Sequence, residues 1–104
     1  MIAVDTNILV YAHREDSEWH SAAAERIAAL AEGKSPWAIP WPCLYEFHAI
    51  VTHPRIYKPP TPVAGALAQI DAWLESPTVV LLHEGDAFWE RLRTLLAQSA
   101  VRGG

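Results

Sequence analysis

The chain contains a single cysteine, Cys43, and no apolar run that approaches the length of a membrane span. One thiol excludes an intrachain disulfide and a cysteine-based zinc site, which suits a reducing compartment, and Cys43 is expected to pack in the core. A membrane span needs about 20 consecutive apolar residues, and the amino terminus lacks the basic start of a signal peptide. We therefore expect a soluble, cytoplasmic protein with no membrane partner.

Basic residues are also in the minority, since 8 Lys and Arg face 12 Asp and Glu and give a net charge of −4. This balance argues against broad, non-specific attraction to nucleic acid, although it is compatible with a local basic rim. The 104 residues, 51% of them hydrophobic, are enough for one core and too few for two. We expect one domain over residues 1–104.

Short apolar runs alternate with helical patterns along the chain. In order, the sequence predicts a strand over residues 1–4, a helix over 6–12, a helix capped by Ser17 and stopped by Gly33, a strand over 37–40, a helix that begins near Pro42, a helix started by Thr61 and Pro62, a strand over 78–82, and a helix capped by Asp86. Three prolines make residues 53–60 a loop. The strand over 78–82 is apolar without alternation, as in a parallel strand covered on both faces.

Apolar faces of two helices define much of the expected core. The second helix carries one face made of Trp19, Ala23, Ile27, Leu30 and Ala31, and the helix after Thr61 carries one made of Val63, Leu67, Ile70 and Leu74. Most of the five tryptophans fall in such stripes or in strands. We therefore expect them to pack in the core rather than to stack on nucleic-acid bases.

The order β-α-α-β-α-α-β-α predicts a three-layer α/β domain with a parallel sheet, right-handed crossovers and helices on both faces. In doubly wound folds the first strand usually lies in the middle of the sheet, because the strand order reverses around it. Three strands are too few to flank it on both sides. We therefore expect one or two further strands beyond Gly104, without which the first strand has an uncovered edge.

A carboxylate stands where the first strand ends and the first helix begins. Asp5, followed by Thr6 and Asn7, comes directly after the apolar residues 1–4. Parallel-sheet enzymes place their chemistry at this kind of junction. The same side chains also suit a helix N-cap, because each accepts hydrogen bonds from free backbone N–H groups. Both roles, a cap and a functional acid, are open on sequence alone.

Glu46 is the second candidate acid, on the helix that begins near Pro42. At about 100° per residue, the apolar side chains of this helix form one stripe, made of Cys43, Leu44, Phe47, Ile50 and Val51. Glu46 is expected at the edge of that stripe, where an unpaired carboxylate is costly. It then needs a donor, a metal or a cation, and an ion pair with an arginine is the plainest alternative.

Taken together, these motifs resemble the PIN-domain ribonucleases, specifically the VapC-type toxins of bacterial toxin–antitoxin systems. The resemblance rests on the strand that ends in Asp-Thr-Asn, the helix segment Pro42–Phe47 and the following Val51–Tyr57, and it covers essentially the whole chain. It implies a metal-dependent endoribonuclease that is a homodimer and is held inactive by a cognate antitoxin. By position, it implies that Asp5 and Glu46 are the first two metal-binding acids, with Thr6 and Asn7 as supporting polar groups.

The chain departs from this family in its acids. Family members place a third acid, and commonly a fourth, in a C-terminal helix and the strand and turn beyond it, and this chain ends before either. Glu84 and Asp86 follow the last strand but stand outside the matching motif, so we expect a solvated side chain and a helix cap. Mg²⁺ or Mn²⁺ prefers hard oxygen ligands, and two carboxylates alone hold it loosely. We therefore expect the 104-residue chain by itself to have little nuclease activity.

Arg55 and Lys58, on either side of Tyr57 in the proline-rich loop, are the best candidates for contacts with RNA phosphates. The five histidines show no spacing typical of a zinc site.

A competing function from another class is a PIN scaffold that binds an antitoxin-like helix and cleaves no RNA. Phosphotransfer enzymes of the haloacid-dehalogenase type also have an Asp at the end of the first strand. They have a second Asp two residues later, where this chain has Asn7.

Overall fold

The computed structural model describes residues 1–83 together with 93 and 97. Its elements, in order, are β1 (Ile2–Ala3), α1 (Thr6–His13), α2 (His20–Glu32), β2 (Trp37–Pro40), α3 (Trp41–Val51), α4 (Val63–Leu74) and β3 (Val79–Leu82). All seven were predicted from the sequence to within a few residues. The expected helix after Asp86 lies outside the described residues except for positions 93 and 97, which are helical. None of the helices within the described part is long and apolar enough to cross a membrane.

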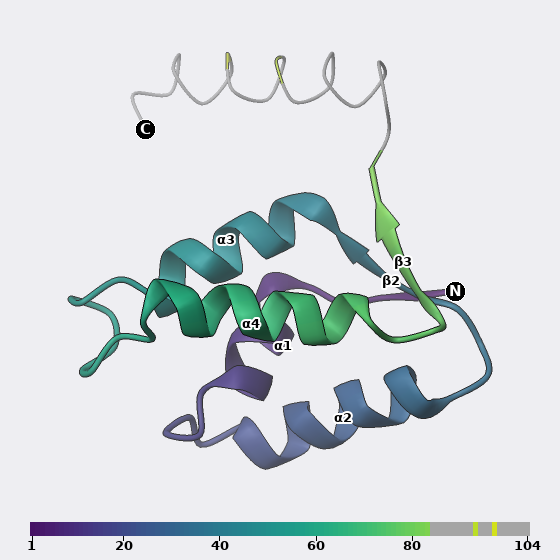
Figure 1. Ribbon diagram of the computed structural model, residues 1–104, viewed down its shortest axis with the longest axis horizontal. Helices are drawn as coiled ribbons and strands as arrows, with labels where there is room; N and C mark the ends of the chain where they lie inside the picture. Colours follow the sequence, from purple (N-terminus) through teal and green to yellow (C-terminus); the bar gives the residue numbers. More distant parts are fainter. Residues whose placement is uncertain (84–92, 94–96, 98–104) are drawn as a thin grey trace.

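The three strands form one parallel sheet in the order β1-β2-β3. Ile2 lies opposite Trp37, and Trp37 lies opposite Val79 in turn. The Val4 N–H donates to the Ala38 carbonyl at 3.0 Å, so the pairing continues to the residue before Asp5. Figure 1 shows α2 below and α3 above the level of β1. The predicted α/β architecture, a parallel sheet with helices on both faces, is confirmed.

Over residues 1–83, β2 is the central strand and β1 lies at an edge, because β2 is the strand that pairs with both of the others. This is the uncovered edge that was expected for the first strand when no further strand flanks it. One expectation about the strands is wrong. β3 is not covered on both faces, since Leu81 is 41% exposed and its neighbours on the strand are similarly open. Its continuous apolar run therefore does not correspond to complete burial.

The core lies where α1, α3 and β2 meet. Its largest fully buried side chains are Trp37, Phe47, Leu9, Ile39 and Val51. The ring of Phe47 meets the ring of Trp73 edge-on at 4.8 Å between centroids. The predicted stripe of α3 is confirmed, because Phe47 and Val51 are buried and the other members pack against the core.

The start of α2 differs from the prediction. Ser17 does not cap the helix, because its Oγ accepts from the Trp19 N–H at 3.1 Å and closes a turn, and the helix begins at His20. Trp19 is thereby held at the N-cap position, 54% exposed, while Ala23 and Ile27 are buried as predicted. Trp37 and Trp73 lie in the core, whereas Trp19 and Trp41 are exposed, so the expectation for tryptophans is right for two of these four. Trp89 lies outside the described residues. Gly33 ends the helix as predicted.

The predicted face of α4 is also wrong for three of its four residues, and only Ile70 packs against the core. Leu67 is 50% exposed, and Val63 and Leu74 are exposed as well, whereas Ala66 and Trp73 are the buried residues of this helix. The helix is apolar almost all round, so its sequence contains a second apolar stripe. This stripe begins at Ala66, spans two turns and ends at Trp73. The small Ala66 lets the helix approach the core closely, and the large indole of Trp73 fills the space beyond it.

We predict that Leu9→Ala lowers the free energy of unfolding by about 2–5 kcal/mol, because Leu9 is fully buried in the core. The matched change Leu67→Ala should stay within about 0.5 kcal/mol, because its side chain is half exposed. Urea denaturation of both variants at low protein concentration measures the difference. Equal losses would show that the exposed face of α4 is buried in the folded protein.

Candidate carboxylate site

Asp5 occupies the junction between β1 and α1 and caps the helix. Its backbone is extended, with φ −98° and ψ 175°, and its Oδ1 accepts from the Ile8 N–H at 3.0 Å. The cap interpretation of Asp5 is therefore confirmed. A cap occupies only one carboxylate oxygen, and the side chain is exposed, so capping leaves Oδ2 available for a ligand.

Glu46 lies halfway along α3 and is joined to α1 by a single hydrogen bond. The Thr6 hydroxyl donates to Glu46 Oε2 at 2.9 Å, across 40 residues of sequence. Glu46 is exposed beside the buried Phe47, and the donor that it was expected to need at the edge of the stripe is the Thr6 hydroxyl. An ion pair with arginine is not found among the described residues, whose ion pair joins Arg14 and Asp16.

The structure thus brings Asp5 and Glu46 to the same end of α1, since Thr6 follows Asp5 and contacts Glu46. Asn7 is exposed on the same first turn. Each carboxylate has one oxygen engaged by a donor, and the two hard-oxygen groups fit the ligand preference of a divalent cation such as Mg²⁺. No group of three His, Cys, Asp or Glu side chains with metal-site geometry occurs within the described part of the chain. Glu84 and Asp86 lie outside it.

Arg55 and Lys58 are not brought to this site. Both are exposed in the loop between α3 and α4, and that loop packs at the carboxyl end of α1 through Tyr57 and Thr61. The carboxylates lie at the amino end of the same eight-residue helix, about 12 Å away along its axis. Any contact of Arg55 or Lys58 with RNA is therefore remote from Asp5 and Glu46.

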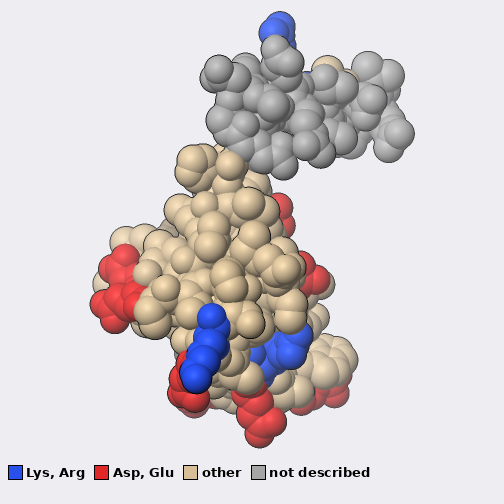
Figure 2. Space-filling model, turned by 90° about the vertical axis from the view of Figure 1, so that its right-hand side faces the viewer, with Lys and Arg blue, Asp and Glu red and all other residues tan. Residues whose placement is uncertain are grey.

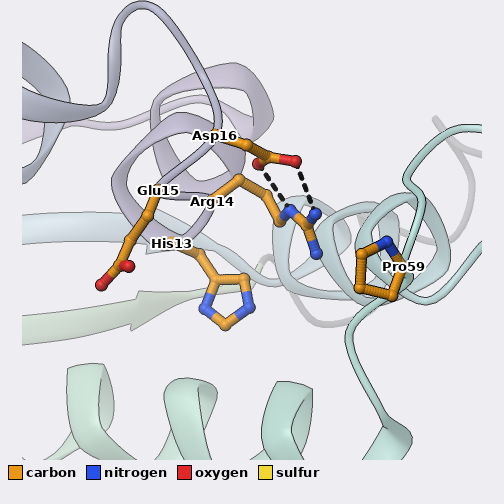
Figure 3. Close-up of a pocket in the computed structure, with 5 residues that line it drawn as sticks. All are labelled: His13, Arg14, Glu15, Asp16 and Pro59. Atoms are coloured by element: carbon orange, nitrogen blue, oxygen red, sulfur yellow. Dashed lines mark hydrogen bonds and ion pairs between the residues drawn. The ribbon is translucent and has the colours of Figure 1, made fainter.

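The loop is held by Arg14, whose guanidinium lies 4.4 Å from the centre of the Tyr57 ring. Arg14 also pairs with Asp16 through two hydrogen bonds, Nη2 to Oδ2 at 2.7 Å and Nε to Oδ1 at 2.9 Å (Figure 3). The hydrogen bond from Arg14 lowers the pKa of the Asp16 carboxyl and raises the pKa of Arg14 itself. Burial raises the pKa of the Tyr57 hydroxyl. The charges in this cluster are already paired, which makes it an anchor for the loop.

His13 completes this anchor by joining α1 to α4. Its Nδ1 lies 3.0 Å from Gln69 Oε1, and its Nε2 lies 3.0 Å from the hydroxyl of the buried Thr61. Together with Arg14, Glu15, Asp16 and Pro59 it lines a cavity of about 380 Å³ (Figure 3). Sequence reasoning missed this cluster, because partners 47 to 56 residues apart leave no local pattern.

Charge is distributed unevenly over the molecule. On the face drawn in Figure 2, basic side chains gather near the lower end with acidic side chains beside them, and the surface above is largely uncharged. This face offers no continuous basic surface. The pattern agrees with the sequence inference that broad, non-specific attraction to nucleic acid is weak.

Comparisons with known proteins identify similar chains. No family model matches this sequence. It is 33% identical over 103 residues to the VapC ribonuclease Mb2897 of Mycobacterium bovis, which covers 99% of this chain and 70% of that protein. Ribonuclease VapC43 of Mycobacterium tuberculosis gives the same values. Ribonuclease VapC33 of Mycobacterium tuberculosis is 33% identical over 85 residues, which covers 82% of this chain and 59% of that protein.

We predict that Asp5→Asn leaves the free energy of unfolding within about 0.5 kcal/mol of the wild type, whereas Asp5→Ala lowers it by about 1 kcal/mol. Asn caps a helix as well as Asp does, while Ala cannot accept from the Ile8 N–H. Thermal or urea denaturation of the two variants checks this. A large loss in Asp5→Asn would mean that the negative charge itself stabilises the fold.

Proposed function

Because the chain belongs to the family of VapC ribonucleases, we propose that it is the toxin of a toxin–antitoxin pair and a metal-dependent endoribonuclease that acts through Asp5 and Glu46. The observation that carries this proposal is the hydrogen bond from Thr6 to Glu46, because it holds the second acid against the helix that Asp5 caps. Two acids from segments 40 residues apart thereby share one exposed edge of the molecule, where an RNA strand can reach them.

Asp5 and Glu46 are proposed to hold Mg²⁺ or Mn²⁺ through the oxygens that their hydrogen bonds leave open. A bound divalent ion supplies a water of lowered pKa and stabilises charge on the phosphate and the leaving oxygen. The protein's own part is positioning: the Ile8 N–H fixes Asp5, and the Thr6 hydroxyl orients Glu46. The amide of Asn7, exposed beside them, is suited to hydrogen-bond a phosphate oxygen or a water.

Arg55 and Lys58 are proposed to bind a phosphate of the RNA other than the one that is cleaved. Their loop lies at the far end of α1, so they add affinity along the strand and take no part in the chemical step. Two carboxylates alone leave a bound ion largely water-coordinated. We therefore propose that the 104-residue chain by itself cleaves RNA slowly. In the predictions below, the natural protein is the product of the intact gene, whatever its length.

The same proposal includes two protein partners, a second copy of the chain and a cognate antitoxin. An apolar groove of about 400 Å³ lies between α3 and α4, lined by Trp41, Leu44, Tyr45, His48, Leu67 and Ile70. Its lining includes no Asp, Glu, Lys or Arg, so two copies of a protein of net charge −4 can meet there without like charges facing each other. The net negative charge also suits a basic, amphipathic antitoxin segment.

We predict that Asp5→Asn lowers metal-dependent RNA cleavage by the natural protein at least about 100-fold with the fold intact, because Asn is neutral and a weaker metal ligand. Gel analysis of a labelled RNA with and without Mg²⁺ measures the effect. Retained cleavage at the wild-type rate would reject the role of Asp5. No cleavage by the wild type with either metal would favour the non-catalytic binding scaffold.

The proposed metal site can also be tested without measuring RNA cleavage. Mn²⁺ added to the 104-residue chain should broaden the amide NMR signals of Thr6, Asn7 and Glu46 before others, and Asp5→Asn should weaken that broadening. Broadening centred elsewhere, or unchanged in the variant, would contradict the metal site.

We predict that the natural protein is a homodimer and that Leu67→Asp makes it monomeric, because the variant places a charge in the groove between α3 and α4. Light scattering coupled to gel filtration measures the mass. The matched control is Ile56→Asp, an exposed apolar residue outside the groove, which should stay dimeric. A wild type that is monomeric at high concentration would overturn the prediction.

A further inference from the structure

A groove between α1 and α2 begins one turn from the carboxylate site. It has a volume of about 400 Å³ and is lined by Ile8, Tyr11, Trp19, Ala22, Ala23 and Arg26. The backbone N–H of Ile8 is the group that donates to Asp5, so one end of the groove touches the turn that Asp5 caps. Residues 14–19 connect the helices, so α2 runs back along α1 toward that end.

The aromatic pair in this groove is held on a fixed support. The Trp19 ring lies 5.1 Å from the Tyr11 ring at an interplanar angle of 40°. The Trp19 backbone is held by Ser17, and His20 Nδ1 lies 3.0 Å from the Tyr11 carbonyl, which ties the start of α2 to α1. Even so, Trp19 is 54% exposed. A large ring that is rigidly supported and open to water is suited to stack on a planar ligand.

The remaining lining residues indicate a ligand that is both planar and anionic. Ala22 and Ala23 are small and leave room beside the indole. Arg26 is the charged residue of the lining; it is exposed and has no ion-pair partner among the described residues. An apolar peptide helix would use the rings and leave Arg26 unused, whereas a nucleotide uses both, through its base and its phosphate.

We propose that this groove is a binding subsite for single-stranded RNA, in which a base stacks on Trp19 and its neighbouring phosphate contacts Arg26. The proposal rests on the proposed ribonuclease function, and it names how the substrate extends from the site of cleavage. The strand runs from Asp5 past Ile8 toward Trp19, so the subsite holds a nucleotide that flanks the cleaved bond. Stacking tolerates any base, so the subsite contributes affinity and strand direction more than sequence choice.

The test measures binding without cleavage. The probe is a fluorescein-labelled six-nucleotide single-stranded RNA, titrated in EDTA and followed by anisotropy. EDTA removes the divalent ion that the proposed cleavage needs, so the probe stays intact. Trp19→Ala should weaken binding about 5- to 100-fold, and Trp19→Phe should restore most of it, because a benzene ring still stacks. Arg26→Gln should weaken binding and reduce the slope of log affinity against log salt by about 0.7. The control is Lys34→Gln, which removes one exposed charge outside the groove. This variant should bind the RNA with nearly the wild-type affinity.

Failure of this subsite is distinguishable from failure of the nuclease assignment. Wild-type affinity in Trp19→Ala, with a circular dichroism spectrum that shows an intact fold, would overturn the subsite whether or not Asp5→Asn abolishes cleavage. Loss of co-purifying cognate antitoxin in Trp19→Ala, with RNA affinity unchanged, would assign the groove to a protein partner and would also overturn the proposal.

Discussion

The packing of α1 against α3 around Leu9 and Phe47 is the interaction on which the candidate site depends. Both side chains are fully buried, and burying each contributes about 1.5–3 kcal/mol. Glu46 immediately precedes Phe47, and Thr6 stands one turn before Leu9, so the hydrogen bond between them lies at the rim of the same contact. That exposed bond contributes only about 0.5–1.5 kcal/mol. Hydrophobic packing therefore brings the helices together, and the hydrogen bond orients the carboxylate.

The other end of α1 is fixed by a polar contact whose centre is the buried hydroxyl of Thr61. In the tautomer of His13 whose Nδ1–H donates to Gln69 Oε1, the other ring nitrogen, Nε2, accepts the hydrogen bond of the Thr61 hydroxyl. Thr61 Oγ1 in turn accepts a hydrogen bond from Arg14. The Thr61 hydroxyl therefore has one partner for its proton and another for its oxygen. The pair of Arg14 with Asp16 contributes stability above the ordinary carboxyl pKa of 3.8, and this contribution is lost as the pH falls through the lowered pKa of Asp16. Because Asp16 is exposed, the contribution is small.

The sequence predicted the features that depend on local pattern. The strands and helices were found because periodicity and turn residues act over a few positions, and Asp5 was recognised both as a cap and as a strand-end acid. Features that depend on tertiary packing were not predicted. An apolar helix such as α4 offers two equivalent stripes, and only the position of its neighbours selects the one with Ala66 and Trp73. Trp19 was wrongly assigned to the core because the turn closed by Ser17 was not predicted. That turn places Trp19 before the helix and not on its apolar face.

The consecutive residues Tyr45 and Glu46 connect two parts of the proposed function. A step of about 100° around α3 separates them, so Tyr45, 72% exposed, lines the groove toward α4 while Glu46 faces α1. A second copy bound in that groove would pack on the same turn that carries the carboxylate. The groove toward α2 has a different lining, with no residue in common, so a second copy bound between α3 and α4 leaves its residues free. The proposed dimer contact and the placement of Glu46 would thereby be coupled through one turn of α3.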